Sequence, residues 1–175
     1  MVAVNGLRAF GAEGPTMLEY RVTKYDPACR NRHGAYARDE WTSACQIGHS
    51  FAGVVLTDAE YRRVEDSYVA SAVAFMRGAG VPLLRVEGVE TYEIPPPFGE
   101  GAVLELFDAE AVIRRVLRAE FWCRLEGAAG FIHLGYDYYM YVGVAQQCPA
   151  AEALAGHRGL FVEPSLSPYR ERRPR

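Results

Sequence analysis

The sequence predicts a single α+β domain in which two amphipathic helices and a short third helix pack on a mainly antiparallel sheet. Two segments repeat apolar residues at steps of three and four, as core-facing helices do. Several shorter segments alternate apolar and polar residues, which is the period of a half-buried strand. Two of these strand-like segments follow one another with no helix between them, and this order favours antiparallel pairing.

The first half of the chain predicts a strand, a polar loop and a long helix. Residues 17–25 alternate as a strand until Asp26-Pro27, where the proline favours a turn. After the polar loop, Thr57 stands where a helix N-cap is expected. An apolar stripe then runs through residues 61–76 and ends near Gly78.

A strand, a loop and a second helix are predicted next. Residues 81–92 alternate as a strand that bends at Gly88. The prolines of residues 95–99 then impose an extended loop. Asp108 is expected to cap the second helix, whose inner face extends as far as Trp122.

The last third of the chain predicts a hairpin, a short helix and a final strand. Residues 131–134 and 138–144 are the two strands of the hairpin, with a turn between them. Cys148-Pro149 begins the short helix, since proline is tolerated in a first turn. Residues 160–163 form the final strand. We therefore expect one domain over residues 17–169, a flexible N-terminal extension over residues 1–16 and a solvated basic tail over residues 170–175.

Composition excludes some classes of partner. The net charge of −3 argues against nucleic acid as the main ligand, because phosphate binding needs a cationic face. The sequence has no apolar stretch of membrane-spanning length, so no membrane partner is expected. The first residues lack the pattern of a secretory signal, and the four cysteines are then most simply reduced thiols. These observations together predict a bacterial-type cytoplasmic protein.

One pattern is compatible with a metal. Cys29 and His33 form one Cys-x3-His pair, and Cys45 and His49 form another. Two thiolates and two imidazoles are a ligand set that tetrahedral zinc accepts. The spacing is not that of a standard zinc knuckle, however, and the rest of the chain is able to build a core without metal. Four separate loop side chains are the favoured interpretation, and a zinc-stabilised binding module is an alternative.

The segment around residues 133–141 is the main functional candidate. In a strand, Asp137, Tyr139 and Tyr141 share one face, while the alternate residues face the core. Together with Tyr136, they would present large amphipathic rings that suit recognition of a protein partner. A catalytic alternative makes His133 or Asp137 a general base of a small enzyme acting on a polar metabolite or nucleotide. A third interpretation is purely structural, because tyrosine is a favoured strand residue.

Trp41 is a secondary candidate for the binding surface. It stands beside two hydroxyl residues and follows Asp39 and Glu40, so it would line a contact surface or a pocket. A single tryptophan after a polar loop more often closes the edge of the core.

Several short sequence motifs resemble those of a known protein family. They are Asp39-Glu40-Trp41-Thr42-Ser43, Ile47-Gly48, Leu56-Thr57, Glu60-Tyr61, Val64-Glu65, Trp122-Cys123, Leu125-Glu126 and the run from Gly135 to Tyr141. Over most of residues 17–170 the chain resembles a family of small bacterial proteins that has no established activity, so the resemblance implies no catalytic residue. By analogy of size and of its compact α+β type, it is similar to immunity proteins of bacterial toxin systems. The leading expectation is a non-enzymatic, protein-binding factor with no cofactor, of the immunity or regulatory kind.

Overall fold

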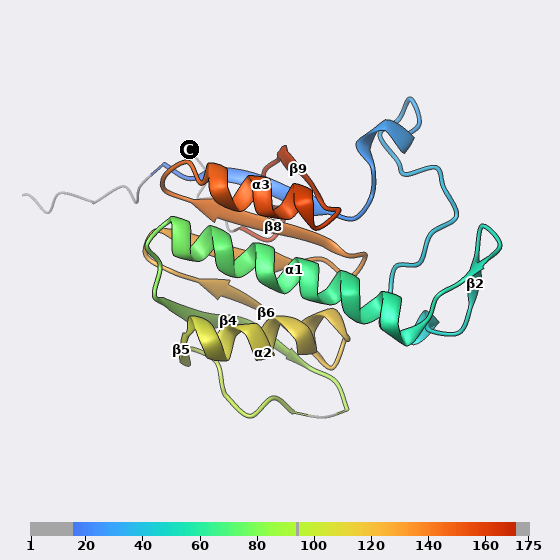
Figure 1. The fold of residues 1–175 in the computed structure, drawn as a ribbon. Helices are drawn as coiled ribbons and strands as arrows, with labels where there is room; N and C mark the ends of the chain where they lie inside the picture. Colours follow the sequence, from blue (N-terminus) through green and yellow to red (C-terminus); the bar gives the residue numbers. More distant parts are fainter. Residues whose placement is uncertain (1–15, 94, 171–175) are drawn as a thin grey trace, which may run out of the picture.

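The architecture is an α+β fold built on one seven-stranded antiparallel sheet (Figure 1), which confirms the predicted class. The computed structural model describes residues 16–93 and 95–170, so the expected extension, apart from Thr16, and the tail beyond Arg170 lie outside the described residues. From one edge to the other, the strands are β5 (Val103–Glu105), β4 (Leu83–Thr91), β6 (Phe121–Glu126), β7 (Gly130–Leu134), β8 (Tyr139–Val144), β1 (Leu18–Thr23) and β9 (Phe161–Pro164).

Three helices lie on the same side of this sheet (Figure 1). Helix α1 (Asp58–Gly78) lies between α2 (Leu106–Leu117) and α3 (Pro149–His157). A small separate hairpin, formed by β2 (Ser50–Phe51) and β3 (Val54–Val55), precedes α1. Within the described ranges, each helix is too short or too polar to cross a lipid bilayer.

Helix α1 forms where the sequence predicts it. The Thr57 hydroxyl accepts a hydrogen bond from the Glu60 backbone N–H at 3.1 Å, as an N-cap should. The Glu60 side chain does not complete a capping box and instead binds Arg63. The apolar stripe is fully buried at Tyr68 and Phe75, so this face supplies the centre of the core.

The second helix ends earlier than predicted. It stops at Leu117, and Trp122 lies on β6 instead of on the helix. The chain turns at Ala119, which adopts a positive φ of 56° without being glycine. The prediction failed here because no glycine or proline marks the turn, and the spacing of Trp122 also fits a continued helical stripe. The three-residue strand β5 and the β2–β3 hairpin were also not predicted.

The pleat divides the sheet residues into two faces. One face is apolar and lies under the helices, with Leu84, Leu125, Ile132 and Met140 all nearly or fully buried. The opposite face, called the helix-free face below, carries mainly charged and aromatic side chains. One register row crosses it through Glu87, Arg124, His133, Tyr141, Arg21 and Glu163. The predicted alternation of the hairpin is therefore confirmed.

The C-terminal segment (residues 165–170) packs on the helix-free face. The Glu19 carboxylate accepts hydrogen bonds from the Ser167 backbone N–H and from the Arg170 guanidinium, both at 2.8 Å. Arg124 donates to the Tyr169 carbonyl oxygen at 2.9 Å, and the Tyr169 ring contacts the Trp122 ring. Arg170, which was expected to belong to a solvated tail, is thus held against the sheet.

Candidate functional site

The tyrosines around the β7–β8 turn separate into a buried set and an accessible set. Tyr138 is 2% exposed and donates a hydrogen bond to the Tyr61 hydroxyl at 2.6 Å, so it belongs to the core. It adopts a positive φ of 62°, and its carbonyl oxygen accepts a hydrogen bond from the buried Tyr68 hydroxyl. These contacts fix the turn and thereby position the tyrosines on its other side.

Tyr136 is the most accessible of the predicted tyrosines. It lies in the turn, is 61% exposed and stacks on the Trp122 ring with a centroid separation of 6.2 Å. Its hydroxyl donates to the Glu90 carboxylate at 2.8 Å. The side chain is therefore both exposed and held in one orientation. Asp137 is also exposed in this turn, which is the structural role that its residue type favours.

Tyr139 and Tyr141 face the helix-free side, as predicted, but both are only partly exposed. The Tyr139 ring packs against Tyr25, and the Arg21 guanidinium lies 4.9 Å from its centroid. The Tyr141 ring meets that of Tyr169 from the C-terminal segment. The structure thus brings the predicted tyrosines to one side of the sheet, with Tyr141 partly covered.

An ion cluster borders Tyr139 at the β9 edge. Glu163 accepts hydrogen bonds from Arg30 and, at 3.0 Å, from Arg21. The Arg30 hydrogen bond, supported by Arg21, lowers the pKa of Glu163 to about 2. The carboxylate therefore stays ionised through the neutral range, and this edge of the face keeps a fixed charge pattern.

His133 has no exposed surface. One ring nitrogen lies 2.7 Å from the Ser167 hydroxyl, the other lies 2.7 Å from the Glu126 carboxylate, and the ring stacks on Phe131. A serine, a histidine and a carboxylate are the components of a hydrolase triad, but Ser167 is also fully buried and faces Nδ1 instead of Nε2. His133 is therefore enclosed, and the predicted convergence of His133 and Asp137 on a substrate does not occur in this arrangement.

Trp41 closes the core instead of forming a contact surface. Its side chain is 5% exposed and packs against Tyr61 and Tyr138. The alternative interpretation, a tryptophan at the core edge, describes its place. The prediction of Trp41 as a binding residue is corrected on this point, because so little of the ring remains available to a partner.

The four candidate zinc ligands are not gathered. Cys29 and Cys45 lie in two separate 3-10 turns, Pro27–Cys29 and Ala44–Gln46. His33 accepts a hydrogen bond from Arg32, and His49 is exposed. Among residues 16–93 and 95–170, no three Cys, His, Asp or Glu side chains are placed to share a metal ion. The zinc arrangement suggested by the two Cys-x3-His pairs is thus not formed.

Lys24 is a chemically unusual residue that the sequence interpretation missed. It is the only lysine in the chain, whose Lys and Arg residues number 19 together. Its side chain is 7% exposed, and its Nζ lies 2.9 Å from the Glu40 carboxylate and 3.9 Å from the centroid of the Trp41 ring. Burial lowers the pKa of Lys24 to about 8. The near absence of lysine from an arginine-rich chain was the available signal.

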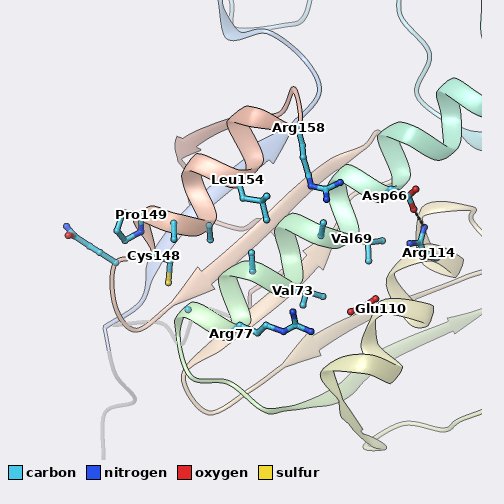
Figure 2. Close-up of a pocket in the computed structure, with 16 residues that line it drawn as sticks. Asp66, Val69, Val73, Arg77, Glu110, Arg114, Cys148, Pro149, Leu154 and Arg158 are labelled. Atoms are coloured by element: carbon cyan, nitrogen blue, oxygen red, sulfur yellow. Dashed lines mark hydrogen bonds and ion pairs between the residues drawn. The ribbon is translucent and has the colours of Figure 1, made fainter.

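A wide groove lies in the helix layer. Figure 2 shows this groove between α1, α2 and α3, with Val69, Val73 and Leu154 along its floor. Its volume is about 1110 Å³. Arg77 and Arg158 stand at its rim, and Arg114 pairs there with Asp66. The floor is apolar and the rim carries both signs of charge. The groove is therefore concave, but its described lining has no evident catalytic group.

Comparison with protein-family models, with curated proteins and with solved structures finds no match for this chain. The resemblance to small bacterial proteins without an established activity therefore stays a prediction, and any functional argument must rest on the geometry.

Proposed function

We propose that this protein is a non-enzymatic binding factor that contacts a protein partner through the turn end of its helix-free face. The contact centre is an aromatic patch formed by Tyr136 and Tyr92, which are 61% and 44% exposed and line one small cavity together with Trp122. The single observation that carries the proposal is Tyr136, a large exposed ring that is held in place before any partner arrives.

Preorganisation explains why this patch suits binding. Ordering a flexible side chain at an interface costs roughly 0.5–1.5 kcal/mol. Tyr136 is already fixed by its stack on Trp122 and by its hydrogen bond to Glu90. A tyrosine also offers apolar area together with a polar tip, which is why it is enriched where protein surfaces meet.

A protein partner fits the patch better than a small molecule does. The cavity beside Tyr136 and Tyr92 measures about 30 Å³, which is close to the share of one water in the liquid. Small ligands usually occupy concave sites of roughly 300–1,000 Å³. The catalytic alternative through His133 gains no support, because that imidazole is enclosed.

An immunity or regulatory role in a bacterial cytoplasm is the form of binding that we propose. The cysteines within the described residues are all free thiols, two of them buried, which is typical of a reducing compartment. A factor that covers a protein partner needs an accessible, rigid surface and no bound cofactor, and the aromatic patch has these properties.

The test compares Tyr136→Ala with Phe107→Ala. Phe107 is 80% exposed on α2, in the helix layer, and serves as a matched aromatic control. The partner in the assay is the protein encoded by the adjacent gene, since an immunity factor is expected to bind it. Its binding would be measured by biolayer interferometry. We expect Tyr136→Ala to weaken the affinity by about 2 kcal/mol, which is about 30-fold in Kd, with little change in Tm. Equal effects of the two substitutions would refute the proposed contact surface.

A further inference from the structure

We propose that Lys24 is the amine of a second, covalent binding site that takes up a small 2-oxo acid as a Schiff base. This site is distinct from the aromatic patch, and it goes beyond the proposed protein-binding function. Its elements are a buried amine, a carboxylate beside that amine and two arginines around a small polar cavity.

The amine is nearly buried, and aromatic rings and one carboxylate surround it. Its Nζ lies over the rings of Trp41 and Tyr25, at 3.9 and 4.4 Å from their centroids. The nearby Glu40 oxygen forms an ion pair, but within the described residues Nζ has no hydrogen bond of good geometry. A buried polar atom without a well-formed hydrogen bond is costly, so its place in this fold calls for an explanation.

The cavity next to Lys24 has the size for a small anion, and three cationic side chains line it together with the carboxylates of Glu40 and Glu60. It measures about 130 Å³, the space of about four waters, and its lining is mostly polar. Arg63 is already held by Glu60, whereas Arg158 has no carboxylate within 4.0 Å among the described residues. Arg158 is therefore free to bind the carboxylate of a ligand, since its planar fork suits that group.

A 2-oxo acid would interact with both the Arg158 guanidinium and the Lys24 amine. Its carboxylate would bind Arg158, and its ketone carbon would then face the Lys24 amine. Simple anions use only the arginine, and simple aldehydes use only the amine, so the combination favours a ligand that carries both groups on adjacent carbons. The ring of Trp41, which lines the cavity, would flank the reacting carbon.

The chemistry is balanced without an external reagent. A proton first passes from the Lys24 ammonium to the Glu40 carboxylate, which frees the amine lone pair. The amine nitrogen attacks the ketone carbon, and its second proton passes to the carbonyl oxygen, which becomes a hydroxyl. The carbon–oxygen bond then breaks as Glu40 returns its proton, water leaves and the carbon–nitrogen double bond forms. The nucleophile and the acid–base group required for this step are both present.

Burial also makes the amine more reactive. Lowering the pKa from 10.5 to about 8 leaves about a tenth of the Lys24 side chains neutral at pH 7. An ordinary lysine would have about 300-fold less neutral amine at the same pH. Lysines that form Schiff bases depend on this effect of desolvation.

The experiment traps the imine on the folded full chain. Pyruvate is added with sodium cyanoborohydride, and peptide mapping by mass spectrometry compares the reduced adduct at Lys24 with that at the α-amino group. Assignment is simple because Lys24 carries the only ε-amine in the chain. We expect saturable labelling at Lys24 that exceeds labelling of the α-amino group at least tenfold. Labelling no faster than in the urea-unfolded chain would overturn the site.

Variants identify the role of each group. We expect Arg158→Met to lower labelling by pyruvate about tenfold while leaving labelling by acetaldehyde, which has no carboxylate, unchanged. The control Arg62→Met removes an exposed α1 arginine that pairs with Asp58, and it should leave both reactions unchanged. Glu40→Gln should slow both reactions, and it should also lower Tm, because the nearly buried Lys24 ammonium then loses its carboxylate partner. Equal labelling by pyruvate in the Arg158 and Arg62 variants would overturn the choice of an oxo acid.

Discussion

Replacing Lys24 by methionine should stabilise the protein at neutral pH. The ammonium is nearly buried, and its pKa is lowered from 10.5 to about 8, chiefly by desolvation. Since one pKa unit corresponds to 1.36 kcal/mol, keeping the charged form in the folded state costs about 3 kcal/mol at pH 7. Methionine has a similar length and keeps the apolar contacts of the stem.

The net gain is smaller than this cost. Losing the cation–π contacts with Trp41 and Tyr25 removes about 1–2 kcal/mol. Glu40 is one-third exposed, so it remains hydrated when its partner is removed. We therefore expect Lys24→Met to raise the free energy of unfolding by about 1–2 kcal/mol, which corresponds to a rise in Tm of about 3–6 °C for a chain of this size.

The pH dependence provides a sharper check. Between pH 8 and 10.5 an unfolded lysine binds more protons than the folded one, so the wild-type protein gains stability as the pH rises. Urea denaturation at pH 7 and pH 9.5 should show the advantage of the variant shrinking by about 2 kcal/mol, whereas Arg62→Met should shift little with pH. The reasoning is refuted if Lys24→Met is less stable at pH 7, or if its advantage does not change with pH.

Three further substitutions test the packing around the site. Gly143→Ala should lower the free energy of unfolding, measured by urea denaturation, by about 2–3 kcal/mol, because the new Cβ would lie 2.0 Å from the Phe131 ring. Unchanged stability would show that the ring moves freely. Tyr68→Phe should cost about 2–3 kcal/mol, since its hydroxyl serves two main-chain groups, and slower amide exchange at the β7–β8 turn would contradict this role. Glu163→Gln should reduce the fall in stability that the wild-type protein shows between about pH 4.5 and about pH 2. The reason is that the lowered pKa of Glu163 stabilises the folded state above this range, and this stabilisation is lost as the carboxylate is protonated. A Tm that falls equally in both proteins over this pH range would argue against the Arg30 contact.

Local sequence patterns predicted most of the fold. Residues 61–76 repeat apolar side chains over four turns, and such a long stripe leaves little choice of structure. The strands from Leu18 to Thr23 and from Tyr139 to Val144 were predictable for the same reason, because alternation fixes which face is buried. Trp122 was misplaced because its spacing satisfies a helix and a strand equally well, and only packing decides between them.

The candidate site depended on contacts that no local pattern encodes. The sequence determined that Tyr139 and Tyr141 lie opposite the core side chains, since this follows from the pleat. Only the tertiary structure decided that the C-terminal segment covers part of that face, that His133 is enclosed and that Tyr136 is fixed on Trp122. It also brought Lys24 and Arg158, which are far apart in the chain, to the lining of one cavity. Burial and charge pairing are sums over neighbours distant in sequence, so they exist only after the chain has folded.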